Sequence, residues 1–248
     1  MYNPFSLQNK TILVTGASSG IGKAIAIECS KMRAKVIITG RNESRLKETY
    51  GLLEGEHPDY IIADLSNREE IENLNEELPT LDGLVNSAGL TRVLPFQFAS
   101  RNKFEEVLEV NFFAPSELTR ILIKSKKIGK GASIVFISSI SGTLCSYLGN
   151  SIYSASKGAI NGLVKGMALD LASKKIRVNT VIPGMINTPI LESSTITKEQ
   201  LEEDIKRYPL KRYGKPEEVA YAVIYLLSNA SSWTTGSNIL LDGGYTLL

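Results

Sequence analysis

The sequence predicts a single α/β domain built on a parallel sheet with helices on both faces. Three observations carry this prediction. Short apolar strands alternate with helical segments along the 248 residues, a glycine-rich turn joins the first strand to the first helix, and polar residues or glycines follow successive strands. No linker or change of composition divides the chain, so we expect one doubly wound domain spanning residues 1–248.

The composition is ordinary for a globular protein and restricts the class of partner. Hydrophobic residues make up 43%, charged residues 22%, and the net charge is +2. We therefore expect a small-molecule partner, not nucleic acid or a membrane. The distant Cys29 and Cys145, with the single histidine His57 in a predicted solvated turn, indicate neither a disulfide framework nor a metal site. Without a basic leader or an apolar run near the roughly 18 residues of a membrane span, a cytoplasmic protein is expected.

The first strand, residues 10–14, leads into a turn suited to phosphate. Within Thr15 to Gly22, the glycines at positions 16, 20 and 22 permit a tight turn and let an anion approach backbone amides at a helix start. The same run also fits the G-x-S-x-G nucleophile elbow of hydrolases. That alternative requires a histidine late in the chain, whereas His57 is early, so a phosphate-binding turn is preferred.

The second strand, residues 35–39, ends at Gly40 and Arg41, where dinucleotide-binding folds meet the adenosine ribose. An acidic residue there binds the ribose 2′-hydroxyl of NAD, and none is present. Arg41 instead offers a permanent, fork-shaped cation for a 2′-phosphate. The position therefore favours NADP over NAD.

The next elements continue the alternation. We expect strands at residues 59–63, 82–86 and 132–138, a helix starting at 64–66, and a long amphipathic helix from about 103 to 126 that contains Asn111. The strands end near Asp64, Asn86 and Ser139. Because the carboxyl ends of parallel strands share one edge, these residues should gather there with Gly16 and Arg41.

The following helix, to about residue 173, places Tyr153 and Lys157 four apart on one face. A free tyrosine has a pKa of about 10, so proton transfer near pH 7 requires that pKa to fall by roughly three, and a nearby lysine typically lowers it by about one to three. Gly158, Gly162 and Gly166 recur at intervals of four. Interior glycines cost about 1 kcal/mol each, which suggests close approach by the sheet or by a second subunit.

The last third supplies a sixth strand at 177–182, a loop through Pro183 and Gly184, a short helix near 198–206, a helix from Pro216 and a seventh strand at 238–241. The irregular, charged segment 187–212 is predicted to form a mobile lid. A partly apolar substrate pocket is expected from these residues: Leu94, Phe96, Leu144, Tyr147, Met185, Ile190 and Leu191.

With these pieces in place, the chain resembles the short-chain dehydrogenase/reductase family over essentially its whole length. Nine motifs occur in that family's order: Thr15 to Gly22, Asp64-Leu65, Asn86-Ser87-Ala88-Gly89, Asn111, Ser139, Tyr153-x-x-x-Lys157, Pro183-Gly184-x-x-x-Thr188, Pro209-Leu210-x-Arg212 and Asp242-Gly243-Gly244. The resemblance implies a Rossmann fold with a seven-stranded parallel sheet, and an NADP(H)-dependent oxidoreductase acting on a carbonyl or secondary alcohol. It also implies a homodimer or homotetramer.

The resemblance further implies roles for individual residues. Tyr153 would be the general acid, Ser139 would orient the substrate oxygen, Lys157 would lower the pKa of Tyr153 and bind the nicotinamide ribose, and Asn111 would hold a water in a proton relay. The oxidised nicotinamide would complete the lowering of that pKa. The cofactor would contact Gly16, Ser18, Ser19, Gly20, Ile21, Gly22, Arg41, Asp64, Leu65, Asn86, Ala88, Gly89, Tyr153, Lys157, Pro183, Gly184, Ile186 and Thr188.

Three departures from the family pattern limit what the resemblance implies. Ser87 replaces an asparagine, no arginine precedes Gly20, and the segment from Ser139 to Tyr153 is one residue longer than the commonest spacing. Ala88 to Arg92 resembles β-ketoacyl-acyl carrier protein reductases, which favours a ketone or 3-ketoacyl substrate, possibly bound to acyl carrier protein. The loop before Tyr153 lacks their usual pattern, so sugar, polyol or steroid substrates stay open, as does a non-catalytic NADP-sensing module.

Overall fold

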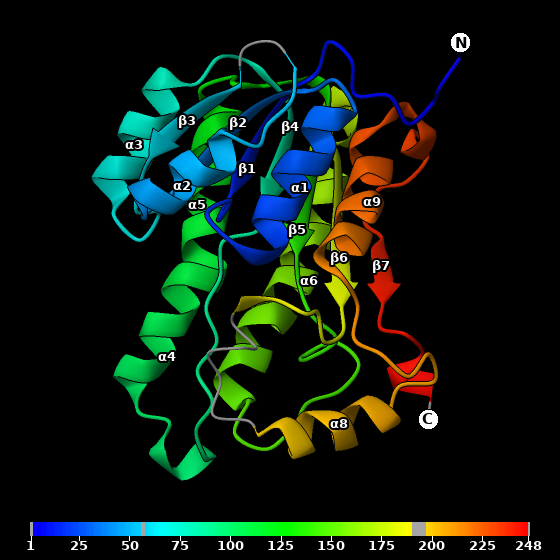
Figure 1. Cartoon of the computed structure of the whole chain (residues 1–248). Helices are drawn as coiled ribbons and strands as arrows, with labels where there is room; N and C mark the ends of the chain where they lie inside the picture. The colour runs from blue at the N-terminus through cyan, green and yellow to red at the C-terminus, as the bar shows by residue number, and fades with distance from the viewer. Residues whose placement is uncertain (1, 56–57, 190–196, 248) are drawn as a thin grey trace.

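Seven parallel strands form one sheet in the order β3-β2-β1-β4-β5-β6-β7 (Figure 1). The computed structural model describes residues 2–55, 58–189 and 197–247. The strands are β1 (Thr11–Thr15), β2 (Lys35–Gly40), β3 (Asp59–Ile62), β4 (Leu81–Asn86), β5 (Ile128–Ile137), β6 (Arg177–Pro183) and β7 (Asn238–Leu241). Strand order reverses between β1 and β4, which is where ligands bind in open parallel sheets. The predicted doubly wound, seven-stranded fold is confirmed.

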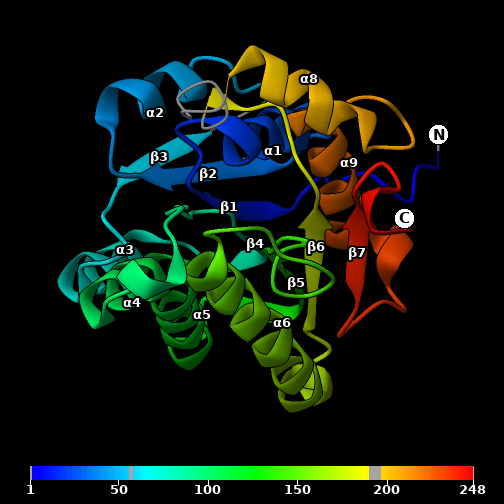
Figure 2. The same cartoon turned by 90° about the horizontal axis from the view of Figure 1, so that it is seen from below.

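Helices cover both faces of the sheet, as the view from below shows (Figure 2). The helices are α1 (Gly20–Lys31), α2 (Glu43–Tyr50), α3 (Arg68–Glu77), α4 (Arg101–Leu108), α5 (Ala114–Lys124), α6 (Ser151–Leu171), α8 (Lys198–Lys206) and α9 (Pro216–Leu227). Helices α1 and α9 close one apolar core and α3, α5 and α6 the other. Within the described residues, no helix combines the length and apolarity needed to cross a membrane.

Several boundaries differ from the sequence predictions for local reasons. Helix α3 begins at Arg68 instead of residue 64, because Asn67 caps it by accepting the Glu69 amide at 3.0 Å, while Asp64 accepts from the Ser66 amide in a turn. Strand β5 begins at Ile128, earlier than expected, and ends at Ile137. A register irregularity between Leu81 and Gly83 accompanies its early start.

The long helix predicted from 103 to 126 contains an interruption. A π-helical turn, η2 (Glu109–Phe113), lies between α4 and α5. A π-helical turn contains one residue more than an α-helical turn, and such turns are frequent at functional sites. Here the turn carries Asn111, whose side chain is 2% exposed.

The three glycines of α6 have different surroundings. A Cβ on Gly158 would lie 3.0 Å from the carbonyl oxygen of Gly142, so the approaching backbone at this position belongs to the loop after β5 of the same chain. Apart from neighbouring residues and the backbone of α6 itself, no described atom lies within 4 Å of the corresponding positions on Gly162 and Gly166. Close approach within the chain therefore explains only the first glycine.

Candidate active site

The turn between β1 and α1, called here the glycine turn, combines left-handed glycines with an uncapped helix start. Gly16 and Gly20 adopt φ values of 66° and 54°, and a Cβ on Gly16 would lie 2.7 Å from the Cα of Ala88. Ser19, the N-cap of α1, makes no side-chain capping hydrogen bond within the described chain, so the first amides of α1 are not satisfied by a cap. Backbone amides at a helix start bind phosphate well, so these residues fit the predicted dinucleotide.

The hydroxyl of Thr15 joins this turn to the one after β4. Its Oγ1 accepts the amides of Ser87 and Ala88 at 3.1 and 3.2 Å. Asn86 is buried and donates to Thr119 Oγ1 at 3.1 Å. The Asn86–Gly89 segment is thereby fixed beside the glycine turn between β1 and α1. This agrees with the expectation that residues at the carboxyl ends of the parallel strands gather at one edge of the sheet.

Arg41 lies at the end of β2 and is 67% exposed, with its Nη1 3.6 Å from Asp64 Oδ2. Burial raises the pKa of Asp64, but hydrogen bonds from Ser66 and the charge of Arg41 outweigh it, so the net pKa is lowered. The position of a Cβ on Gly40 lies 3.6 Å from Ser18 Oγ, which places the β2 end against the glycine turn. An exposed ion pair contributes roughly 0–1 kcal/mol, so Arg41 can exchange Asp64 for a phosphate at little cost.

Tyr153, Lys157 and Ser139 come together at the carboxyl end of β5. Lys157 Nζ lies 5.7 Å from the centroid of the Tyr153 ring and donates to the carbonyl of Ile137 at 2.8 Å. The Ser139 hydroxyl lies near enough to the Tyr153 phenol to lower its pKa, and it accepts the Ser141 amide at 3.1 Å. A proton donor and a second hydroxyl are therefore adjacent, beside a buried cation.

The pKa values of this group differ from the role that the resemblance implies. Burial raises the pKa of Tyr153 to about 12, against a lowering by Ser139, and burial lowers the pKa of Lys157 to about 8. The Lys157 ammonium, which donates to the Ile137 carbonyl, does not offset the burial of the phenol. In this structure the pKa of Tyr153 is thus raised, not lowered, and a further positive charge is needed to bring it toward neutrality.

Asn111 is held in place by protein partners. Its Oδ1 accepts the Leu90 amide at 2.8 Å, and its Nδ2 donates to the Leu90 carbonyl at 2.9 Å and to Ser156 Oγ at 3.0 Å. A Cβ on Gly89 would lie 3.3 Å from Asn111 Oδ1 and 3.6 Å from Lys157 Nζ, so Asn111 and Lys157 flank this glycine. The water relay through Asn111 stays a prediction.

The loop after β6 lies next to the turn between β1 and α1. Thr188 lies 3.4 Å from the position of a Cβ on Gly20, which brings the loop over the glycine turn between β1 and α1. The side chain of Ile186 is buried in the core beside Gly214, so its backbone is the part that can face a nicotinamide. Leu65 is also buried, at 8% exposed.

The predicted substrate pocket is only partly described. Phe96, Leu144 and Tyr147 are at least half exposed on two loops that are joined by a hydrogen bond from the Leu94 amide to the Gly149 carbonyl at 2.9 Å. Ile190, Leu191 and His57 lie outside the described residues. No cluster of potential metal ligands occurs among the residues that are described.

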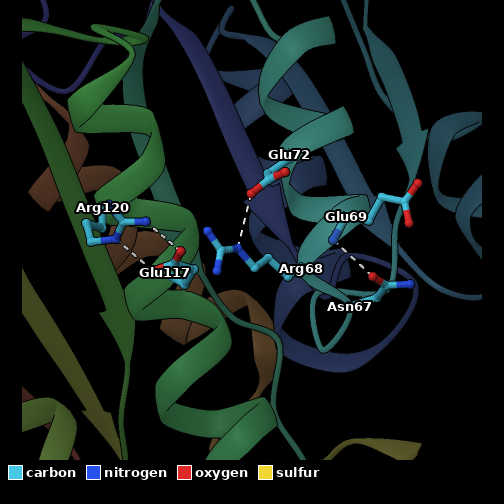
Figure 3. Close-up of polar contacts among 6 residues, drawn as sticks. All are labelled: Asn67, Arg68, Glu69, Glu72, Glu117 and Arg120. Carbon is cyan, nitrogen blue, oxygen red and sulfur yellow. Dashed lines mark hydrogen bonds and ion pairs between the residues drawn. The ribbon is translucent and has the colours of Figure 1, made fainter.

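A hollow of about 400 Å³ lies elsewhere, between α3 with the turn before it and the η2–α5 segment. Arg68 pairs with Glu72 at 3.1 Å, and Arg120 forms a two-pronged pair with Glu117 (Figure 3). Neither Ser139 nor Tyr153 lines it. This hollow is therefore separate from the candidate catalytic group.

Sequence reasoning missed several residues that support the site. Ser156 accepts a hydrogen bond from Asn111, and Thr143 and Asn161 hold the loop after Ser139 through side-chain hydrogen bonds. Ser156 lies within the Tyr153–Lys157 motif, and Asn161 follows Lys157 by one helical turn, so helical spacing was the available signal.

The chain is similar to known proteins over nearly its whole length. The family model described as enoyl-(acyl carrier protein) reductase matches residues 16–246. The chain is 37% identical to a 3-oxoacyl-(acyl-carrier-protein) reductase of Rickettsia prowazekii, covering 98% of this chain and 99% of the relative, and 36% identical to a tropinone reductase homolog of Arabidopsis thaliana, covering 98% and 94%. A solved structure of a putative NAD(P)-dependent gluconate 5-dehydrogenase from Beutenbergia cavernae, with bound NADP, is 31% identical with a TM-score of 0.89, covering 99% and 100%. The chain belongs to the short-chain dehydrogenase/reductase family of oxidoreductases.

Proposed function

We propose that this chain is an NADP(H)-dependent reductase of a ketone or 3-ketoacyl group, working reversibly on the corresponding alcohol. The adjacency of Ser139, Tyr153 and Lys157 at the carboxyl end of the sheet carries this proposal. Two hydroxyls side by side can hold one carbonyl oxygen, and one of them can protonate it. The name of the Rickettsia relative supports the 3-ketoacyl substrate.

In the proposed mechanism, the Ser139 hydroxyl donates a hydrogen bond to the substrate oxygen and fixes its position. Tyr153 then donates its phenolic proton to that oxygen as it gains negative charge. A nicotinamide bound at this edge of the sheet would supply the hydride and, once oxidised, a positive charge that would lower the pKa of the phenol. Lys157 holds its ammonium against the face of the Tyr153 ring, close to the hydroxyl that gives up the proton. Burial lowers the pKa of this ammonium to about 8.

The preference for NADP rests on Arg41. We expect Arg41→Gln to raise the KM for NADPH at least about tenfold and to leave the KM for NADH nearly unchanged, because it removes a charge-assisted contact that only the 2′-phosphate makes. Arg45→Gln is the matched control, since Arg45 is exposed on the neighbouring helix. Equal effects on both coenzymes would contradict this assignment.

A panel of carbonyl compounds tests the substrate class. The protein is mixed with NADPH and, separately, 3-ketoacyl thioesters, simple ketones, keto-sugars and steroid ketones, and the loss of reduced-nicotinamide absorbance is followed. Fastest turnover of the thioesters supports the 3-ketoacyl proposal, including a substrate carried on acyl carrier protein. Turnover of another group alone reassigns the substrate, and tight NADPH binding without any turnover indicates a non-catalytic sensing module.

We also propose a homodimer or homotetramer that pairs through α6. The open positions at Gly162 and Gly166 and the exposed Leu169 support a neighbouring helix on this face. A monomeric mass by light scattering at micromolar concentration would refute it. Two further proposals stand. Segment 187–212, of which residues 190–196 lie outside the described residues, is proposed as a substrate lid. The protein is proposed to work in the cytoplasm, where its free thiols Cys29 and Cys145 stay reduced.

A further inference from the structure

We infer that Asn161 and Thr143 are positioning residues that hold Ser139 against Tyr153. The inference rests on the proposed function, because it assigns these residues to the same reaction. Neither side chain touches the phenol. Both instead connect helix α6, which carries Tyr153, with residues 139–146 after β5, called here the serine loop.

The connection is a short chain of hydrogen bonds. Asn161 Nδ2 donates to Thr143 Oγ1 and also to the Lys157 carbonyl at 3.0 Å. Thr143 Oγ1 in turn donates to the Ser139 carbonyl at 3.3 Å. The backbone of Ser139 is therefore tied, through two side chains, to the helix turn that bears Lys157.

The serine loop approaches α6 closely around this connection. Gly142 has a φ of 87°, and a Cβ there would lie 2.0 Å from the Ser154 carbonyl oxygen, so the loop backbone lies directly on the helix. A separate hydrogen bond of 2.8 Å joins Ser146 Oγ to Ser154 Oγ. Of these contacts, only the Asn161–Thr143 connection reaches Ser139 itself.

The burial of Asn161 indicates that geometry, and not stability, is its contribution. The residue is 7% exposed, and its Oδ1 has no hydrogen-bond partner in the described part of the chain. A buried acceptor without a partner destabilises a fold by roughly 1–3 kcal/mol. Leucine has a similar size and would not bear this cost, so an asparagine here is explained by the contacts that its Nδ2 makes.

The position of Ser139 contributes to the acidity of the reacting phenol. Burial raises the pKa of Tyr153, Ser139 lowers it, and the neighbouring Tyr147 raises it. If the serine loop shifts, that lowering is lost and the pKa of Tyr153 rises. The pH at which alcohol oxidation reaches half its maximal rate then rises too, because oxidation requires the deprotonated phenol.

The test uses two variants that break the connection, Asn161→Leu and Thr143→Val. Two controls accompany them: Thr143→Ser keeps the hydroxyl, and Ser146→Ala removes a loop–helix hydrogen bond that does not lead to Ser139. We expect the first two variants to lower kcat about 10- to 100-fold and to shift the oxidation profile to higher pH, with unchanged NADPH affinity and no loss of thermal stability in Asn161→Leu. Thr143→Ser and Ser146→Ala should stay within about threefold of wild type.

The double variant should be no slower than the worse single variant, because both changes break one connection. Activity-free evidence comes from crystal structures, in which Ser139 Oγ should move away from the Tyr153 hydroxyl in Asn161→Leu but not in Ser146→Ala. A wild-type kcat and pH profile in Asn161→Leu, or lost thermal stability with Ser139 unmoved, overturns the inference. If the wild-type protein reduces no carbonyl while Ser139 moves as expected, the proposed function fails and the positioning role stands.

Discussion

Replacing Gly16 by alanine should destabilise the fold and the cofactor site together. At a φ of 66° an alanine costs roughly 1–2 kcal/mol. Its Cβ would also lie 2.7 Å from the Cα and 2.8 Å from the amide nitrogen of Ala88, well inside the optimum of about 3.5–4.0 Å for carbon contacts. Relieving such overpacking costs a further 1–3 kcal/mol or so, giving a total of about 2–5 kcal/mol.

Urea denaturation measures this loss of stability. Fluorescence titration with NADPH measures the loss of affinity that a displaced glycine turn between β1 and α1 would cause. Gly131→Ala is the matched control, since Gly131 has a φ of 84° with no described atom within 4 Å of the Cβ position, so it carries the backbone cost alone. We expect Gly131→Ala to lose only about 1–2 kcal/mol and no NADPH affinity. If Gly16→Ala loses no more stability than the control and binds NADPH normally, the close packing of the two turns is not what fixes the site.

Three further predictions concern α6. Gly162→Ala should lower the mass measured by light scattering, because its Cβ would enter the proposed subunit contact; an unchanged mass would exclude a tight contact at this position. Ser156→Ala should lower the free energy of unfolding in urea by about 1–3 kcal/mol, since it leaves the buried amide of Asn111 without one acceptor, and an unaltered midpoint would contradict this. Burial lowers the pKa of Lys157 from 10.5 to about 8. Between these two pH values the unfolded chain binds more protons at Lys157 than the folded chain does. The contribution of Lys157 to the free energy of unfolding therefore rises with pH, by at most about 3 kcal/mol. Lys157→Met should lack this rise relative to wild type in denaturation curves taken from pH 7 to 10, and parallel curves would refute the lowered pKa.

The strands and the positions of the site motifs could be predicted from the sequence because their signals are local. Apolar runs ended by Gly16 or Asn86 mark strand ends, and parallel topology brings those ends to one edge. The spacing of Tyr153 and Lys157 placed both on one side of α6 without any knowledge of their neighbours. Each of these patterns occupies fewer than ten residues, so each can be recognised in the sequence before the fold is known.

Features that depend on tertiary packing could not be predicted in this way. The π-helical turn around Asn111 has no hydrophobic period of its own, since it continues the pattern of α4 and α5. The direction in which the pKa of Tyr153 moves is set by burial, which is a property of the folded chain. The link from Asn161 to Thr143 joins residues 18 apart, so its recognition required the serine loop to be placed on the helix.

The most direct test of the proton-transfer role is the kcat of Tyr153→Phe measured beside its NADPH affinity. Phenylalanine keeps the ring above Lys157 and removes only the hydroxyl, so binding should be preserved while the proton donor is lost. The account predicts NADPH affinity within about twofold of wild type and a fall in kcat of at least about 100-fold for the best carbonyl substrate, the usual contribution of a general acid. A Tyr153→Phe variant that reduces this carbonyl at the wild-type rate would contradict it.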